Sequence, residues 1–322
     1  MEIIVADGLA RTFRSGKTTV SAVQGVDLSV NRGEIVGFLG PNGAGKTTTL
    51  RMLTTLLRPT AGTARIAGAD IVTQAAAVRQ RIGYIAQAAS ASPKHRVYEE
   101  MHLQARLHRM EPTLARRRIE FLLTQLELAD LGHRMACTLS GGQRRRLDVA
   151  LGLVHEPAVI FLDEPTAGLD PQSRSNLWEH IRWLREEQEA TVFLTTHYLE
   201  EADALCDRIL VIDHGRIIAE DSSANLKQSV ASTVVLVEVD GDAASGVVVL
   251  EGLTEVREVT AMDGKTLRMS VGEDDDDRVV LDAVTALRAA GLEVRSFSLT
   301  RPTLEDVFFN LTGRALRDGA GV

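Results

Sequence analysis

The N-terminal and middle parts of the chain alternate short apolar runs with longer stretches of helical periodicity. A short apolar run bounded by turn residues is typical of a buried strand. After the first run, leucines recur at helical spacing over Lys46–Leu57 until Arg58 and Pro59 end the pattern. Strands that alternate with helices predict an α/β fold, in which helices cover a mostly parallel sheet. The runs are Glu34–Phe38, Ile82–Ala86, Val159–Leu162, Thr191–Thr195 and Arg208–Ile212.

A helix-rich insert separates the second of these runs from the third. It contains an apolar stripe, because Ile119, Leu122, Leu123 and Leu126 are spaced to share one face of a helix. We expect this insert, about residues 88–155, to form a helical subdomain. It would belong to an α/β domain that covers residues 1–222.

The periodicity changes after about Ser222. Four further apolar runs predict strands, and Arg278–Ala290 predicts a helix among them. We therefore expect residues 223–322 to form a small α+β domain with an accessory or dimerisation role. The acidic run Glu273–Asp277 lies between a strand and this helix, and we interpret it as a solvated loop rather than a cation site. The four runs are Val234–Val237, Val247–Leu250, Leu267–Val271 and Val294–Leu299.

Length and composition are those of a globular protein with more than one domain. The 322 residues suffice for a large and a small domain, and a content of 44% hydrophobic and 25% charged residues excludes disorder across the whole chain. No apolar run approaches the roughly 18 residues that span a bilayer, and the start Met1–Ile4 lacks the basic residues of a secretion signal. We expect a cytoplasmic protein that contacts the membrane through a protein partner.

Charge and cysteine content exclude several classes of function. The net charge of -8 opposes general attraction to nucleic acid or anionic lipid, so no nucleic-acid partner is expected. The triplets Arg116–Arg118 and Arg144–Arg146 have no interleaved aromatic residues, and we interpret them as solvated helix faces or salt-bridge partners. Cys137 and Cys206 match no zinc or paired-thiol spacing.

A glycine-rich motif follows the first apolar run and opens the first predicted helix. It has the pattern G-x-x-x-x-G-K-[ST] in the strand-to-helix setting that this pattern requires. Glycines let backbone amides close around phosphate oxygens, and the helix N-terminus adds a favourable dipole. We expect Lys46 to neutralise the terminal phosphates of ATP and the Thr47 hydroxyl to ligate Mg²⁺. The motif, hereafter the phosphate loop, consists of Gly40, Pro41, Asn42, Gly43, Ala44, Gly45, Lys46, Thr47 and Thr48.

Two adjacent carboxylates, Asp163 and Glu164, follow the third apolar run. The carboxyl ends of parallel strands are where nucleotide sites form. Asp163 is expected to hold Mg²⁺ or one of its waters, and Glu164 to orient or deprotonate the water that attacks the γ-phosphate. The alternative is a solvated turn, which the phosphate loop upstream disfavours.

A serine and two glycines precede another predicted helix, Gln143–His155. Ser140, Gly141 and Gly142 would present a hydroxyl and free amides to a γ-phosphate at a helix N-terminus. The alternative is a glycine-rich turn before an ordinary helix. The order of all these motifs resembles the ATP-binding cassette (ABC) family. In that family the element matched by Leu139–Gln143 is the signature, which contacts the nucleotide held by the opposite subunit of a dimer.

Further positions match the family one residue at a time. Gln87 resembles the glutamine that senses magnesium and relays the nucleotide state towards the transmembrane partner. His197 resembles the switch histidine that contacts the γ-phosphate, and Gly168–Asp170 resembles the loop that crosses the dimer interface. Phe13 stands where the family usually stacks an aromatic ring, more often tyrosine, on adenine. The resemblance implies catalytic roles for Lys46, Gln87, Glu164 and His197, Mg²⁺ ligation by Thr47, Gln87 and Asp163, and contact with the partner's nucleotide by Ser140, Gly141, Gly142, Gln143 and Asp170.

The C-terminal segment narrows the resemblance to a subfamily. Ser298–Phe308, followed by Asn310–Gly313, is similar to the end of cassettes of the daunorubicin-resistance type. That resemblance implies a homodimer docked on the cytosolic side of separate integral membrane permease subunits. It also implies ATP-driven export of a hydrophobic drug, polyketide or lipid. The contact with the permease is expected at Gln87–Tyr98.

Three other functions remain open on the sequence alone. An importer ATPase keeps the enzyme class but reverses the direction of transport. A soluble ABC ATPase acting on ribosomes or nucleic acid usually carries two cassettes per chain, whereas this chain has one. A non-catalytic nucleotide-binding regulator is disfavoured by the presence of Glu164.

Overall fold

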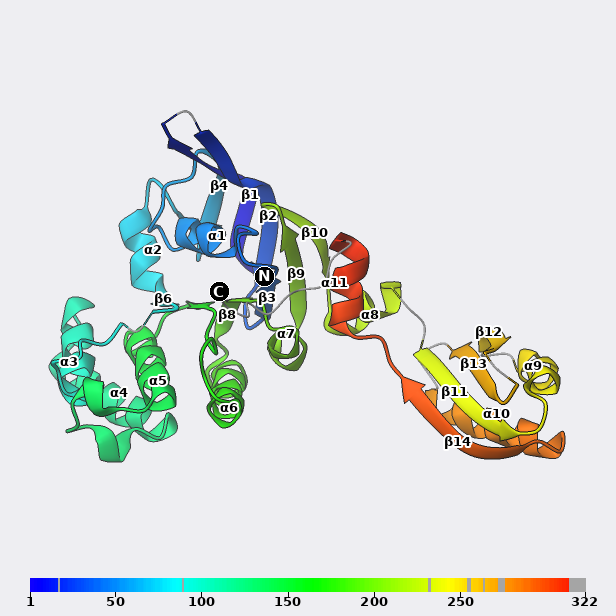
Figure 1. Ribbon diagram of the computed structural model, residues 1–322. Helices are drawn as coiled ribbons and strands as arrows, with labels where there is room; N and C mark the ends of the chain where they lie inside the picture. Colours follow the sequence, from blue (N-terminus) through cyan, green and yellow to red (C-terminus); the bar gives the residue numbers. More distant parts are fainter. Residues whose placement is uncertain are drawn as a thin grey trace. The chain divides into compact units, whose positions relative to one another are not determined.

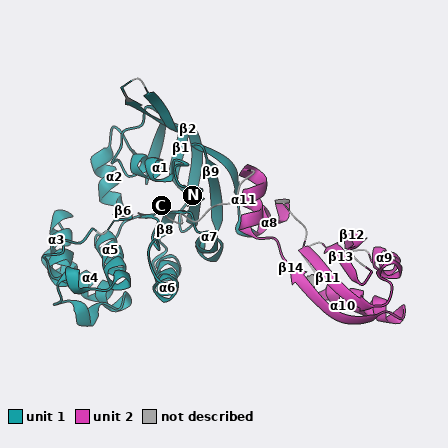
Figure 2. Ribbon diagram, in the orientation of Figure 1, with its two compact units in different colours: residues 1–223, 316–322 teal, residues 224–315 magenta. Residues whose placement is uncertain are grey.

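The computed structural model describes residues 1–16, 18–88, 90–230, 233–253, 256–262, 264–271 and 276–312. The described residues form two compact units (Figures 1 and 2). The first contains residues 1–223, and the second begins at Ala224. Among the residues described, no helix is both long and apolar enough to cross a membrane.

A six-stranded sheet forms the centre of the first unit. Its strand order is β10-β9-β3-β8-β7-β6, and neighbouring strands are parallel except for β9 and β10. All residues of β3, β7 and β8 are buried, as expected where helices cover both faces of a parallel sheet. The predicted α/β fold is confirmed. The strands are β3 (Ile35–Leu39), β6 (Ile82–Ile85), β7 (Val159–Asp163), β8 (Thr191–Thr196), β9 (Arg208–Asp213) and β10 (Arg216–Asp221).

A second sheet in this unit is antiparallel and was not predicted. Its order is β2-β1-β4-β5, and its apolar side chains share a core with Leu50 of α1 and Phe38 of β3. Bulges interrupt the pairing of β1 with β2 at several points, so the apolar alternation along the sequence is broken. The strands are β1 (Glu2–Ser15), β2 (Thr18–Asn31), β4 (Ala61–Ile66) and β5 (Ala69–Asp70).

Helices of the first unit cover the central sheet, and those between β6 and β7 form the helical subdomain, hereafter the helical lobe. The apolar stripe from Ile119 to Leu126 is buried, and it shares a core with Leu147 of α5 and Ile160 of β7. The first helix ends at Leu53, four residues before the predicted end, because Thr55 adopts a positive φ of 65°. The helices are α1 (Lys46–Leu53), α2 (Ala75–Arg81), α3 (Val97–Leu107), α4 (Pro112–Gln125), α5 (Gly141–Leu153), α6 (Pro171–Gln188) and α7 (Leu199–Leu205), with short 3-10 turns at Ala129–Leu131 and Ala136–Thr138.

The second unit is a small α+β arrangement, as predicted. Its antiparallel sheet has the order β12-β13-β11-β14. The prediction of a strand at Val247–Leu250 is wrong, because Asp242 caps a helix that contains this run. Of the acidic run, Asp276 and Asp277 begin α10, and residues 273–275 lie outside the described residues. The elements are α8 (Ser223–Val230), β11 (Thr233–Asp240), α9 (Ala243–Glu251), β12 (Val256–Ala261), β13 (Thr266–Val271), α10 (Asp276–Ala289), β14 (Glu293–Thr300) and α11 (Leu304–Thr312).

Candidate active site

The phosphate loop connects the end of β3 to the start of α1. A Cβ atom on Gly40 would lie 2.3 Å from the carbonyl oxygen of Ile212 in β9. A Cβ atom on Gly45 would lie 2.6 Å from the carbonyl oxygen of Ala22 in β2, and Gly45 also has a φ of 110°. The loop is therefore pressed between two strands, and glycine is required at both positions.

Lys46 begins α1 and turns its ammonium group back into the loop. Its Nζ donates to the carbonyl oxygens of Gly40 at 2.6 Å and Pro41 at 3.2 Å. The side chain is only 4% exposed, and this burial lowers the pKa of Lys46, an effect that Glu164 and Asp163 oppose. No side chain caps α1, so the amides of its first turn are available to a ligand. A buried cation at an uncapped helix N-terminus suits phosphate binding.

Hydroxyl and carboxylate oxygens meet beside the loop. Asp163 ends β7, and its Oδ1 accepts hydrogen bonds from Thr47 Oγ1 at 3.2 Å and from Thr195 Oγ1 at 2.7 Å. Oxygen ligands of this kind are those that Mg²⁺ prefers in nucleotide sites. Thr47 and Asp163 therefore fit the predicted cation site.

Glu164 is the point at which the other predicted catalytic side chains meet. Its Oε2 accepts a hydrogen bond from Gln87 Nε2 at 2.9 Å. Its Oε1 lies 3.3 Å from Nδ1 of His197, without hydrogen-bond geometry, and 3.6 Å from Nζ of Lys46. Three residues that are distant from Glu164 and from one another in sequence thus converge on its carboxylate.

The backbone and charge of Glu164 are both unusual. Its φ of 44° lies in the left-handed region, and its amide donates to the carbonyl and hydroxyl oxygens of Thr195. Strained backbone of this kind is concentrated at functional sites. His197 lowers the pKa of Glu164 and Lys46 adds to this effect, whereas burial opposes it. The carboxylate is therefore ionised at neutral pH and able to accept a proton.

The signature lies at the exposed start of α5. Ser140 caps the helix, because its Oγ accepts from the Gln143 amide at 3.3 Å while its own amide donates to Gln143 Oε1 at 3.0 Å. Ser140 and Gly141 are exposed, whereas a Cβ atom on Gly142 would lie 2.6 Å from Ser173 Oγ in α6. The signature thus forms a rigid helix N-terminus that a ligand on another molecule could reach.

Asp170 and Phe13 have other partners in the structure. The carboxylate of Asp170 caps α6, accepting from the Ser173 amide at 2.9 Å and from Ser173 Oγ at 2.7 Å. These hydrogen bonds lower the pKa of Asp170. Phe13 lies in β1 with 40% of its surface exposed, and the guanidinium carbon of Arg11 lies 4.8 Å from its ring centroid. Contact of either residue with nucleotide stays a prediction.

Sequence reasoning missed two residues that support this site. Thr195 is fully buried and hydrogen-bonds both Asp163 and the amide of Glu164. Its position at the end of an apolar run was a usable signal. The interpretation of the triplet as a solvated helix face or salt-bridge partner is wrong for Arg145, because this residue is 7% exposed and donates to main-chain carbonyls around the carboxylates. No local pattern distinguishes it from Arg144 and Arg146.

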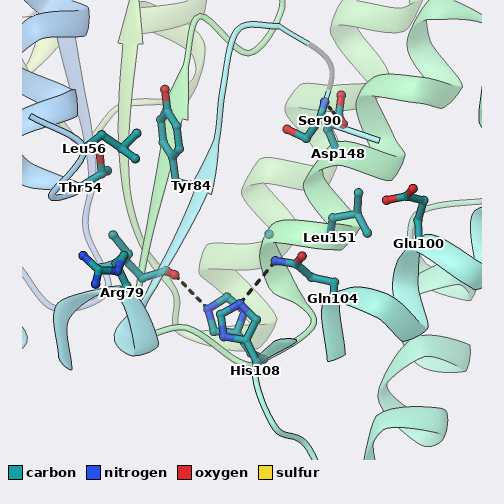
Figure 3. Close-up of a pocket in the computed structure, with 13 residues that line it drawn as sticks. Thr54, Leu56, Arg79, Tyr84, Ser90, Glu100, Gln104, His108, Asp148 and Leu151 are labelled. Atoms are coloured by element: carbon teal, nitrogen blue, oxygen red, sulfur yellow. Dashed lines mark hydrogen bonds between the residues drawn. The ribbon is translucent and has the colours of Figure 1, made fainter. Parts of the chain in front are cut away.

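A cavity of about 300 Å³ opens between the central sheet and the helical lobe (Figure 3). Tyr84 and Asp148 line it, together with Gln104 of α3 and His108, which directly follows that helix. The His108 ring stacks on that of His155 at a centroid distance of 3.6 Å. Asp148 of α5 accepts hydrogen bonds from the amides of Ser90 at 2.8 Å and Ala91 at 3.2 Å. The segment that follows Gln87 is therefore tied directly to α5.

The half-buried His155 of this cavity predicts a dependence of stability on pH. Burial, with a smaller contribution from His108, lowers the pKa of His155 from 6.5 to about 4. Between these two pH values the unfolded chain binds a proton at His155 that the folded chain excludes. The free energy of unfolding therefore has its full value above pH 6.5 and decreases as the pH falls towards 4. The loss amounts to up to about 3 kcal/mol.

Denaturant unfolding of the wild type and of His155→Gln between pH 7 and pH 4.5 measures this effect. Glutamine can still donate to the carbonyl oxygen of Ile82, which His155 Nε2 contacts at 2.9 Å. We expect a shallower pH dependence in the variant. Equal slopes for the two proteins would contradict the assignment.

Comparison with known proteins agrees with this geometry. Residues 23–167 match the ABC transporter family, and residues 222–312 match the C-terminal domain of DrrA1-3-like ATP-binding proteins. A dimeric ATP-binding cassette in a post-hydrolysis state, bound to ADP and Pi, superposes with a TM-score of 0.62 at 26% identity, covering 68% of this chain and 98% of that one. The fold and site thus define an ABC-type ATPase.

Relatives similar over nearly the whole length extend the comparison. The daunorubicin resistance ATP-binding protein DrrA3 of Streptomyces coeruleorubidus is 43% identical over 314 residues, 96% of each chain. The daunorubicin/doxorubicin resistance ATP-binding protein DrrA of Streptomyces peucetius is 42% identical, covering 98% of this chain and 94% of that one. The Nod factor export ATP-binding protein I of Cupriavidus pinatubonensis is 40% identical, covering 94% and 89%.

The chain therefore belongs to the ATP-binding cassette transporter family, with a C-terminal domain of the DrrA type. It is an ATP-binding and ATP-hydrolysing transport subunit, and the prediction of an exporter ATPase is confirmed. These relatives do not favour the importer or soluble alternatives.

Proposed function

We propose that two copies of this chain bind two MgATP molecules in shared sites and use their hydrolysis to drive export through separate membrane permease subunits. The observation that carries this proposal is the convergence of Lys46, Gln87 and His197 on the carboxylate of Glu164. The exposed signature around Ser140 complements it, because its hydroxyl and helix N-terminus could cover a γ-phosphate held by another copy.

Each side chain then has a defined task in hydrolysis. Lys46 and the first-turn amides of α1 hold the terminal phosphates, while Thr47 and Asp163 would hold Mg²⁺, which supplies positive charge to the phosphate oxygens. Gln87 fixes one oxygen of Glu164 and would reach towards the cation. The ionised Glu164 orients the attacking water and accepts its proton, and His197 contacts the γ-phosphate.

The cargo class and the location of the protein are inferred from its relatives. The names of the relatives refer to daunorubicin, doxorubicin and Nod factor. We infer a hydrophobic drug, polyketide or lipid as cargo, recognised by the permease, with this chain peripheral on the cytosolic face of the membrane. Residues 1–222 would act as the nucleotide-binding domain, and residues 223–322 as an accessory domain that supports dimerisation.

The cavity of Figure 3 is the proposed contact with the permease. Its wall includes Ser90, which belongs to the expected contact segment Gln87–Tyr98. In this segment the Ser92 amide and His95 Nδ1 both contact Glu100 Oε1, at 3.1 Å and 2.7 Å. A side chain of the permease inserted here would press on residues that are tied to both α3 and α5.

Co-purification tests this contact and the function together. Tagged chain isolated from detergent-solubilised membranes of its host is expected to retain a polytopic membrane protein, identified by mass spectrometry. Gln104→Trp should abolish this recovery, because indole would fill the cavity, whereas His102→Trp on the exposed face of α3 should preserve it. Recovery of ribosomes in place of a membrane protein would reject the export proposal. Equal recovery by both variants would reject the cavity as the contact.

A further inference from the structure

Arg145 is a buried guanidinium whose three nitrogens all donate to main-chain carbonyls. Nε donates to Pro165 at 2.7 Å, Nη2 to Asp163 at 3.2 Å, and Nη1 to Ala86. Two of these acceptors flank Glu164, and Ala86 directly precedes Gln87. One side chain therefore holds the backbone on both sides of the carboxylate and beside the glutamine that bonds it.

The charge of Arg145 is satisfied by carbonyl dipoles and not by an ion pair. Among the described residues, no carboxylate forms a salt bridge with it. Burial lowers the pKa of Arg145, while Asp148, Glu201 and Asp163 oppose this from a distance. A planar guanidinium can donate in three fixed directions at once, which an ammonium group on a flexible stem cannot reproduce. The three hydrogen bonds therefore fix the positions of the carbonyl groups on both sides of Glu164. A left-handed backbone conformation, such as that of Glu164, persists only where the surrounding structure holds it in place.

The neighbouring arginines contact different parts of the chain. Arg144 Nη2 donates to the carbonyl oxygen of Ala136 at 3.1 Å, and Arg146 pairs with the exposed carboxylate of Glu127. Within the part of the chain that the structure describes, neither forms a hydrogen bond or ion pair with the strand ends that carry Gln87 and Glu164. Arg146 therefore provides a matched control on the same helix.

We infer that Arg145 is a positioning residue for hydrolysis, which fixes Glu164 and Gln87 relative to the signature helix α5. This inference rests on the proposed function, in which Ser140 at the start of α5 contacts the nucleotide of the partner copy. Arg145 lies five positions after Ser140, the N-cap of the same helix. A movement of the signature on the partner's nucleotide is thereby transmitted to the catalytic carboxylate of the same chain, so Arg145 links the two ATP sites of a dimer.

Substitution of Arg145 should slow hydrolysis and leave nucleotide binding intact. In Arg145→Lys and Arg145→Gln we expect kcat to fall roughly 10- to 100-fold, because a small displacement of a catalytic group costs about that much. The Kd of a fluorescent ATP analogue should stay within about twofold of wild type, since the phosphate loop is untouched. Arg146→Lys should hydrolyse ATP at the wild-type rate.

A second readout separates positioning from a structural defect. With ATP and Mg²⁺, Arg145→Lys should accumulate as a dimer on size-exclusion chromatography, even though it retains Glu164. A structural defect would instead weaken ATP binding and dimerisation together. A kcat within about twofold of wild type, or a parallel loss of kcat and affinity, would overturn the inference. Failure of both variants to fold, judged by circular dichroism, would assign Arg145 to folding and also overturn it. Failure of the wild type to hydrolyse ATP would instead reject the proposed function.

Discussion

Glu164→Gln is expected to lose ATP turnover by about 1,000-fold while still binding ATP, because an amide can neither accept the proton of the attacking water nor attract it by charge. The side chain keeps its size, and Gln87 can still contact it. Lys46 remains in the phosphate loop, so the triphosphate is held as before. The variant should therefore accumulate an ATP-bound dimer.

Phosphate release and size-exclusion chromatography with and without ATP measure the two parts of this prediction. Glu200→Gln is a suitable control, because Glu200 is an exposed carboxylate of the same unit whose partner, Arg174, lies 3.9 Å away. The control should hydrolyse ATP normally. If Glu164→Gln turned over ATP at the wild-type rate, another group would have to be the base.

Lys46→Ala should act at the earlier step and weaken nucleotide binding itself. The ammonium group of Lys46 is buried inside the phosphate loop, and charge-assisted hydrogen bonds to phosphate oxygens are stronger than neutral ones. We expect the Kd for ATP to rise roughly 10- to 100-fold. This range corresponds to the loss of one or two charge-assisted hydrogen bonds to phosphate, which water would replace in part.

Titration with a fluorescent ATP analogue tests this expectation. Lys94→Ala removes an exposed lysine of the same unit and should leave the Kd unchanged. An unaltered affinity in Lys46→Ala would mean that the phosphates are bound elsewhere. Lys46→Ala and Glu164→Gln thus separate ATP binding from hydrolysis, since only Lys46→Ala should prevent formation of the ATP-dependent dimer.

The sequence was most informative where the functional residues are contiguous. In the phosphate loop, strand, glycine-rich turn and helix follow one another, so the motif carries its own structural context. Asp163 and Glu164 could be predicted because they directly follow the fully apolar run Val159–Leu162 of β7. Parallel strands then bring Glu164 and His197 to the same edge of the sheet, and the structure shows that Gln87 joins them.

Other features depend on contacts between distant segments and had no local signal. Arg145 is distinguished from its neighbours only by the strand ends that it meets, which lie 18 to 59 residues away in sequence. The run Val247–Leu250 is apolar throughout, and a fully apolar segment has no periodicity that separates helix from strand. The Asp242 cap marks the start of the helix, and Gly246 lies so close to Leu267 of β13 that a Cβ atom would lie 2.6 Å from its Cδ1.

The central claim is that one ATP is held between the phosphate loop of one copy and the signature of another. Cysteines at Asn42 and Ser140, which are both exposed, test it in a Glu164→Gln chain whose exposed Cys137 is replaced by serine. With ATP and a short bifunctional thiol reagent, we predict rapid cross-linking into dimers, little cross-linking without nucleotide, and none when either cysteine is absent from both copies. Cross-linking at equal rates with and without ATP, or a chain that stays monomeric at saturating ATP, would contradict it.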